Sequence, residues 1–377
     1  MTLARVSADH PTTPCPSETT LTIALEALMN GDFQKRWDAV KLFSQLDSQA
    51  IDAAIELLDA DDDDWELSWF IARILGQSDR PQAIEALVEL LATSSDEDVK
   101  TMAANTLSNF GERAIAPLTD LLAEPQWRQL AIAALARTQN PGAIEPLLSV
   151  AEDPDPAIRA AVLEALHAFR DPRILPCLVV ALDDLSAIVR REATIGLGLH
   201  AAGGMTTSQE LDLVKLLERR LSDFNLSVCQ QAAVALSRCG TDAAARALFR
   251  VLQAPHTPVP LQVEIARSLS WIDSLLALEY LRQSLELPSP TVCLEAIRSI
   301  GQVSKSQYRS LCTRILLDWS RSTHPALQHP EIRQAIALEL GRLGDSQALS
   351  YLQHLQKDPD PKVRIHAETA YQMVIGH

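Results

Sequence analysis

The side chains best suited to metal or thiol chemistry in this chain are nine histidines and six cysteines. A zinc site needs three or four such ligands to converge, and no spacing in the sequence suggests this. The nearest imitation of a metal-binding helix is His366-Ala367-Glu368, but residues i and i+2 of a helix point to different faces. The sequence therefore predicts no metal site and no catalytic residue.

The cysteines show neither metal-type nor redox-type spacing, so we interpret them as reduced thiols in a cytoplasmic compartment. They are Cys15, Cys177, Cys229, Cys239, Cys293 and Cys312. The only glycine pair that could imitate a phosphate loop, Gly196-Leu197-Gly198, lies inside a helical pattern and follows no strand. We expect it to permit close helix packing, and we expect no resident cofactor.

Two tryptophans form the first candidate binding feature. Trp65 and Trp69 are one helical turn apart and follow the acidic run Asp61 to Asp64. Acids at a helix start are favoured by the helix dipole, so the run could be an extended cap and the indoles could be core. The alternative is an aromatic and acidic anchor for a partner. Trp37 and Trp127 would join that surface if their repeats align.

Charged residues of the second helices form the other candidate feature. Early second helices carry the acids Glu85, Glu89, Asp120 and Glu145. Later ones carry bases that could hold carboxylates of a bound protein helix or of a bilin. We expect second helices to line the concave side of the stack. The candidate partner-binding bases are Lys215, Arg219, Arg220, Arg246, Arg250 and Arg282.

A repeat near thirty residues positions these side chains. The first-turn position occupied by Arg36, Arg128, Arg159 and Arg190 recurs at spacings of 28 to 32 residues when Ser68 and Lys100 are included. Such a period with no strand signal is typical of a helical solenoid. We predict an all-α, right-handed superhelix of about ten helical pairs, whose units begin near residues 32, 63, 96, 126, 155, 186, 225, 259, 290 and 330, with a half unit near 358.

Turn residues suggest how the repeats are held in register. Acids or amides precede the second helix of several units, and each can cap that helix. Each could also pair with a cation of the next unit, such as Arg159, Arg190 or Arg364, and so build a ladder through the stack. These turn residues are Asp79, Asn140, Asp171, Asp242 and Asp345.

Composition limits the partners and the layout. The formal net charge of −16 argues against nucleic acid and anionic membrane surfaces. No apolar run reaches the roughly 18 residues of a membrane span, so we predict no integral membrane segment. We expect a disordered tail at 1–20, one repeat arm at 21–253 and another at 259–377, with a hinge at the proline-rich linker 254–260.

The repeat motif resembles a known family. Asp153-Pro154-Asp155-Pro156-Ala157-Ile158-Arg159 returns at 358–364 as Asp-Pro-Asp-Pro-Lys-Val-Arg, and Ala114-Ile115 with Pro117-Leu118 opens a second helix. This pattern is similar to the HEAT-like repeats of the phycobilisome lyase type. The resemblance implies several roles: subunits of lyases that attach bilins to phycobiliprotein cysteines, chaperone-like factors for the same antenna proteins, and general scaffolds.

We therefore expect a non-catalytic scaffold or chaperone that binds a protein along its concave groove; the resemblance implies a phycobiliprotein or another photosynthetic component as that partner. One alternative is a bilin lyase or isomerase subunit, with bilin as a transferred ligand. A second alternative is a metal-dependent hydroxylase. Related hydroxylases of deoxyhypusine bind two irons through His-Glu dipeptides, and no histidine here is followed by glutamate.

Overall fold

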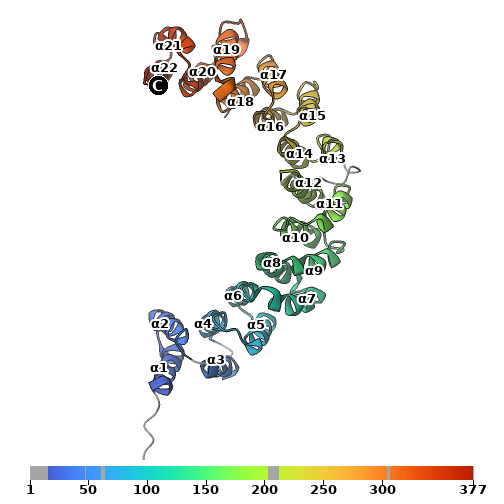
Figure 1. Ribbon diagram of the computed structural model, residues 1–377, viewed down its shortest axis with the longest axis vertical. Helices are drawn as coiled ribbons and strands as arrows, with labels where there is room; N and C mark the ends of the chain where they lie inside the picture. The colour runs from blue at the N-terminus through green and yellow to red at the C-terminus, as the bar shows by residue number, and fades with distance from the viewer. Residues whose placement is uncertain (1–15, 47, 61–63, 203–211, 304–305, 377) are drawn as a thin grey trace, which may run out of the picture. The chain divides into compact units, whose positions relative to one another are not determined.

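The computed structural model describes residues 16–46, 48–60, 64–202, 212–303 and 306–376, and all regular structure in these ranges is helical (Figure 1). Within these ranges, ten pairs of helices follow one another. In each pair the first helix is even-numbered and the second is odd-numbered, while α1 precedes the pairs and α22 follows them. The predicted all-α class and the number of pairs agree with these ranges.

The helices of residues 16–171 are α1 (Pro16–Asn30), α2 (Phe33–Phe43), α3 (Ser48–Ala60), α4 (Trp65–Leu75), α5 (Pro81–Thr93), α6 (Glu97–Ser108), η1 (Gly111–Ala114), α7 (Ile115–Ala123), α8 (Arg128–Thr138), η2 (Pro141–Ala143), α9 (Ile144–Ser149) and α10 (Pro156–Leu166). Those of residues 172–377 are η3 (Pro172–Ile174), α11 (Leu175–Ala181), α12 (Ala187–Ala202), α13 (Leu213–Arg220), α14 (Leu226–Cys239), α15 (Asp242–Leu252), α16 (Val259–Ser270), α17 (Leu275–Ser284), α18 (Pro290–Gly301), η4 (Ser306–Tyr308), α19 (Arg309–Ser320), η5 (Pro325–Gln328), α20 (Pro330–Leu343), η6 (Ser346–Ala348), α21 (Leu349–Leu355) and α22 (Pro361–Ile375).

Local sequence explains where the helices begin and end. The side chain of Asp155 accepts a hydrogen bond from the amide of Ala157, and Pro156 occupies the first helical position of α10. Asp360 and Pro361 do the same for α22, and both arrangements satisfy free amides at a helix start. Gly240 ends α14 at φ 65°, a left-handed conformation that glycine adopts without steric cost.

The chain forms two compact units, residues 1–171 and 172–377. The predicted linker 254–260 lies inside the second unit, where α14 packs on α16 and α15 packs on α17; a hinge there stays a prediction. Most of the predicted tail, residues 1–15, lies outside the described residues, and residues 16–20 already belong to α1.

Small residues bring the first helices of neighbouring repeats close together. A Cβ added at Gly198 would lie 2.7 Å from the Cβ of Ala235, and one at Gly341 would lie 2.7 Å from the Cβ of Ala370. This close approach shortens the stack on the side of the first helices. Within the second unit, Figure 1 shows α12, α14, α16 and α18 along the inner side of the curve and α13, α15 and α17 along the outer side. The expected concave placement of the second helices is therefore wrong for this unit.

An inter-repeat arginine ladder fixes the register of neighbouring repeats. Arg190, in the first turn of α12, donates two hydrogen bonds to Asp223 at 2.8 and 2.7 Å and two to the carbonyls of Asp184 and Leu185 at 2.9 and 3.1 Å. Arg333 makes the same contacts with Asp358 and the carbonyls of residues 327 and 328. Arg36 pairs with Asp64, and Arg128 with Asp153.

The acids of this ladder differ from those expected. Asp64, Asp153, Asp223 and Asp358 precede first helices, because the arginine reaches along the stack to the loop that opens the next repeat. Of the residues ahead of the second helices, Asn140 and Asp345 each accept an amide hydrogen bond in the following turn. Asp79 instead lies 3.9 Å from Arg113 of the next repeat, as the ladder hypothesis expects.

The arginine ladder is interrupted in the middle of the second unit. There the arginine position is occupied by Cys229, Gln262 and Cys293 in α14, α16 and α18. The thiol of Cys229 donates to the carbonyl of Asp223, and that of Cys293 donates to the carbonyls of Leu285 and Leu287. These two thiols thus contact the same loop that an arginine would hold, but without an ion pair.

A buried carboxylate between two first helices gives one testable prediction. Glu339 of α20 is 1% exposed beside Gly301, and its Oε2 atom has no hydrogen-bond partner among the described residues. Burial raises the pKa of Glu339, so its charged form costs stability as pH rises above the ordinary value of about 4.3. We expect Glu339→Gln to stabilise the protein by about 1 kcal/mol at pH 7 and by nothing near pH 4, measured by urea unfolding at both pH values.

Glu331→Gln, an exposed change in the same helix, is the control and should leave the midpoint nearly unchanged at both pH values. If Glu339→Gln instead lowered stability at pH 7, the contact between Glu339 and Arg342 at 2.9 Å would outweigh the burial of charge.

Candidate functional site

The exposed face of each second helix can be defined by its buried leucine. Leu87, Leu217, Leu248 and Leu316 are each fully buried against the first helices. Residues two positions before and two after such a leucine lie about 160° around the helix from it. These two rows therefore point away from the core in every repeat.

In the second unit these rows are mainly basic. They hold Lys215 and Arg219 in α13, Arg246 and Arg250 in α15, and Arg314 in α19, and all five are exposed. In α17 the rows around Leu281 hold Glu279 and Gln283, with the exposed Arg282 at the neighbouring position, and in α19 the second row holds the exposed Asp318. Since α15 packs on both α13 and α17, these side chains share one surface. We call it the basic face: Lys215, Arg219, Arg246, Arg250, Arg282 and Arg314.

Several of these cations have acidic neighbours. Arg250 pairs with Glu218 of the preceding second helix, and Lys215 lies 3.0 Å from Asp212. Arg282 donates two hydrogen bonds to Glu279 at 2.9 and 2.7 Å, which lower the pKa of that carboxyl. Among the described residues, Arg219, Arg246 and Arg314 make no ion pair. These three are the cations best placed to meet an external acid.

Arg220 does not join the basic face. It donates to the carbonyl of Leu182 at 2.8 Å and to Asp183 at 3.0 Å, and its side chain is only 18% exposed. It also lies 3.8 Å from Asp223, the acid of the arginine ladder. Arg220 therefore links successive repeats of the second unit. Sequence spacing alone could not distinguish this structural role from a role in partner binding.

The corresponding rows of the first unit are acidic. They hold Glu56 in α3, Glu85 and Glu89 in α5, Asp120 in α7 and Glu145 in α9, all exposed. These second helices also pack in succession, α3 on α5 and α5 on α7. We call this surface the acidic face. The contrast between units, visible in the sequence as a split of charge, therefore also holds at matched positions of the second helices.

Each face contains a groove between successive second helices, lined by both apolar and polar side chains. A groove of about 360 Å³ between α17 and α19 is lined by Leu285, Leu311 and Ile315, with Arg282 and Arg314 also lining it. A groove of about 280 Å³ in the first unit is lined by Ile55, Leu58 and Leu90, with Glu89. On the basic face, Phe249 and Tyr280 stack with ring centroids 4.0 Å apart. Apolar contact area therefore accompanies charge on each face.

The two tryptophans of α4 differ in environment. Trp65 is 52% exposed. Trp69 is half-buried and packs edge-on against the core residue Phe70 at 5.1 Å. The guanidinium of Arg73 lies 4.6 Å from the Trp37 ring and 6.0 Å from the Trp69 ring. Trp37 and Trp69 thus both contact Arg73, whereas Trp127 lies against Lys100. Asp64 caps α4 and pairs with Arg36, while Asp61 to Asp63 lie outside the described residues.

This difference predicts unequal effects of removing the two indoles. Trp65→Ala should leave thermal stability almost unchanged, because the side chain is mostly in solvent. Trp69→Ala should cost about 1–3 kcal/mol, below the range for a fully buried aromatic, because contacts with Phe70 and Arg73 are lost. Thermal unfolding of the two single variants measures both effects. Equal losses would mean that Trp65 is also held by packing.

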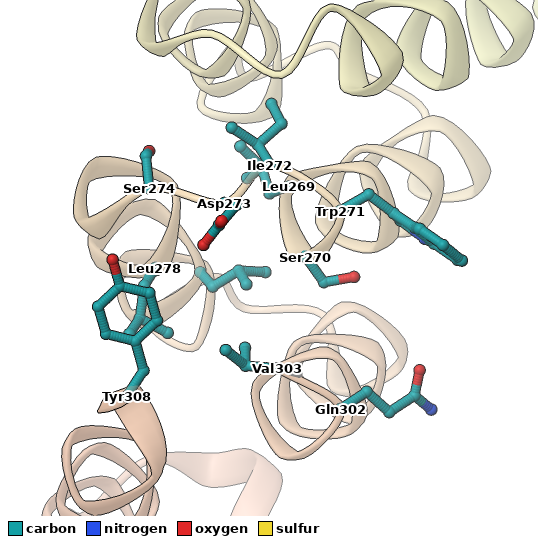
Figure 2. Close-up of a pocket in the computed structure, with 11 residues that line it drawn as sticks. Leu269, Ser270, Trp271, Ile272, Asp273, Ser274, Leu278, Gln302, Val303 and Tyr308 are labelled. Atoms are coloured by element: carbon teal, nitrogen blue, oxygen red, sulfur yellow. The ribbon is translucent and has the colours of Figure 1, made fainter. Parts of the chain in front are cut away.

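The cavity in Figure 2 lies beside the turns of two consecutive repeats in the second unit and has a volume of about 200 Å³. Leu269, Ile272, Leu278 and Val303 contribute apolar walls, while the Trp271 ring points away from it (Figure 2). Asp273 and Tyr308 are the titratable residues among those that line it. A cavity of this size is smaller than the roughly 300–1,000 Å³ typical of small-molecule sites.

The described ranges hold neither a metal cluster nor a membrane-spanning helix. No three His, Cys, Asp or Glu side chains there converge as metal ligands would. No helix within those ranges combines the length and apolar composition needed to cross a bilayer. Cys229, Cys239, Cys293 and Cys312 are free thiols.

Burial predicts low reactivity for two of these thiols. Cys293 and Cys312 are 0% exposed, and burial raises the pKa of each to about 11. Since the thiolate is the reactive form, iodoacetamide at pH 8 should alkylate half-exposed Cys177 but neither buried cysteine. In urea all three should react, as mass spectrometry of tryptic peptides would report. Fast alkylation of native Cys293 would show that the first helices open readily.

Comparison with known proteins identifies the repeats. A family model of HEAT repeats matches residues 21–108, 51–129, 115–198 and 287–372. Kap121p bound to Ste12p is 12% identical over 95% of this chain and 45% of that chain, with a TM-score of 0.62. The karyopherin Kap121p bound to the extreme C-terminus of the protein phosphatase Cdc14p is 12% identical over 95% of this chain and 46% of that chain, and its TM-score is also 0.62. This chain thus spans less than half of the karyopherin chain, and at this identity the likeness shows the fold alone.

Human deoxyhypusine hydroxylase in complex with glycerol is 21% identical over 78% of this chain and 97% of that chain. Its TM-score of 0.31 is too low to support an argument about this chain. No curated protein matches the sequence. The predicted all-α solenoid is confirmed, while a specific relation to phycobilisome lyases is not established by these matches.

Proposed function

Because this chain belongs to the HEAT-repeat family, we propose that it is a non-catalytic scaffold that binds another protein through the basic face of its second unit. The observation that carries the proposal is the repetition of exposed cations at matched positions of α13, α15 and α19. Repetition across helices makes an extended surface, which suits a protein partner better than a small molecule. The partner chemistry that fits is a segment with carboxylates and some apolar side chains.

The ionisable groups of the chain support a role without catalysis. The Asp223 and Asp358 carboxyls have lowered pKa values because Arg190 and Arg333 donate hydrogen bonds to them. These are the acids of the arginine ladder, so their shifts come from contacts between repeats. The karyopherin structures also support protein binding, since Kap121p is bound to Ste12p in one and to a Cdc14p terminus in another.

The narrower form of the proposal is that the partner is a phycobiliprotein or another photosynthetic component in the cytoplasm. Its support is the resemblance of the repeat motif to the phycobilisome lyase type. In this form the protein has no resident cofactor, and a bilin would be met only as part of the partner.

Affinity capture tests the proposal. The purified protein should retain a defined partner from native lysate at low salt, identified by mass spectrometry, and lose it at high salt. Capture of a phycobiliprotein would support the narrower form. Mixing the protein with free bilin and apo-phycobiliprotein should give no covalent visible absorbance; chromophore transfer would replace the scaffold proposal with a lyase. No salt-sensitive partner at all would refute the proposed role of the basic face.

A further inference from the structure

The acidic and basic faces are complementary to each other. Glu85, Glu89 and Asp120 occupy the same positions around the buried leucine in the first unit as Arg246, Arg250 and Arg219 do in the second. Neighbouring packed helices lie about 8–10 Å apart, and both faces are built from successive packed second helices. Rows of charge on the two faces therefore repeat at similar distances and with opposite sign.

The apolar parts of the faces are also suited to each other. Between the acidic rows lie the half-buried side chains of Ile55, Val88 and Leu148. Between the basic rows lie the stacked rings of Phe249 and Tyr280. Each face thus combines apolar with charged side chains, as protein interfaces do. Two acidic faces or two basic faces would instead repel each other.

We infer that this chain self-associates head to tail: the acidic face of the first unit of one copy docks on the basic face of the second unit of another. This inference rests on the proposed binding role of the basic face and names a second copy as an occupant. Such a contact joins two different surfaces, so it can propagate from copy to copy. A foreign acidic partner would compete for the same arginines.

The attraction is electrostatic, so salt controls it. Exposed charges more than about 10 Å apart are largely screened at 0.1 M salt. Sedimentation velocity of the purified full chain should show concentration-dependent association in 50 mM NaCl. The association should weaken at least about tenfold in 500 mM NaCl.

Charge reversal on each face provides the decisive test. Glu85→Lys with Glu89→Lys changes only exposed acids, and Arg219→Glu with Arg246→Glu changes only exposed bases. Each double variant alone should remain monomeric in 50 mM NaCl. An equal mixture of the two variants should associate again, because each then offers a face opposite in sign to one on the other. Circular dichroism and thermal melting check that both variants are folded.

The outcomes separate this inference from the proposed function. Wild-type protein that stays monomeric at 200 μM, or variants whose mixture fails to associate, would overturn the inference. The Glu85 and Glu89 variant should lose self-association but still capture a foreign partner from lysate. Self-association without any captured partner would instead refute the scaffold role while leaving the head-to-tail contact in place.

Discussion

Arg190→Ala should destabilise the second unit by about 3–5 kcal/mol, the cost of breaking a buried ion pair from one side. The Arg190 side chain is 13% exposed, and that of Asp223 is 4% exposed. Removing the guanidinium leaves the Asp223 carboxylate without its bidentate partner and frees the carbonyls of Asp184 and Leu185. We expect a lower urea midpoint together with faster hydrogen exchange in α12 and α14.

Arg191→Ala is the matched control, because the side chain of the adjacent Arg191 is 42% exposed and lies 3.7 Å from Glu192. The Glu192 side chain is only 11% exposed, but this single contact is long and Arg191 itself reaches solvent. We therefore expect Arg191→Ala to cost clearly less than Arg190→Ala. Similar losses for the two variants would contradict the assignment of Arg190 to the ladder.

The same pair makes a pH dependence that the variant should lack. The pKa of Asp223 is lowered, chiefly by the hydrogen bond from Arg190. Such an acid adds stability above its ordinary pKa of about 3.9, and this stability is lost as pH falls through the lower folded value. The gap in stability between wild type and Arg190→Ala should therefore narrow below about pH 4.

Reversal of two cations on the basic face should have the largest effect on partner binding. Arg219→Glu with Arg246→Glu replaces attraction by repulsion at two exposed positions without touching the ladder. Kd for the captured partner should rise about 10- to 100-fold in 50 mM NaCl, and the difference should shrink at high salt. Biolayer interferometry at several salt concentrations measures this.

Arg238→Glu with Arg298→Glu is the control for this experiment. It changes the net charge equally, but at exposed residues of the first helices α14 and α18. Equal weakening by the two double variants would show that overall charge governs binding. Weakening by the control alone would move the site to the inner side of the second unit.

The repeat boundaries could be predicted because they depend on local chemistry. Asp155 with Pro156, and Asp360 with Pro361, identify helix starts directly from sequence, and the structure places caps at those residues. The all-α class follows from the same repeated pattern. The sequence also shows that early second helices carry acids and later ones carry bases. Assigning these residues to exposed positions requires only the helical periodicity.

Other features depended on distances between repeats and could not be predicted. The sequence shows Asp223 thirty-three residues after Arg190, but not that the side chain crosses between repeats to meet it. It also does not show which helices approach most closely, a matter decided by contacts such as Gly198 with Ala235. For this reason the second helices of the second unit were expected on the wrong side of the curve. Arg314 could have been found, since it precedes Leu316 as Arg246 precedes Leu248.

The replacement of arginine by Cys229, Gln262 and Cys293 has a mechanical consequence. An ion pair between repeats resists bending and sliding at the loop that it joins, whereas a hydrogen bond from a neutral thiol to a carbonyl is much weaker. Arg267 of α16 still pairs with Glu295 of α18 at 2.9 Å, but the three repeats opened by α14, α16 and α18 lack the ion pair at the loop, so we expect them to bend more easily than their neighbours. They bear part of the basic face, on α15 and α17, so the surface there can adjust its curvature to the shape of what it holds.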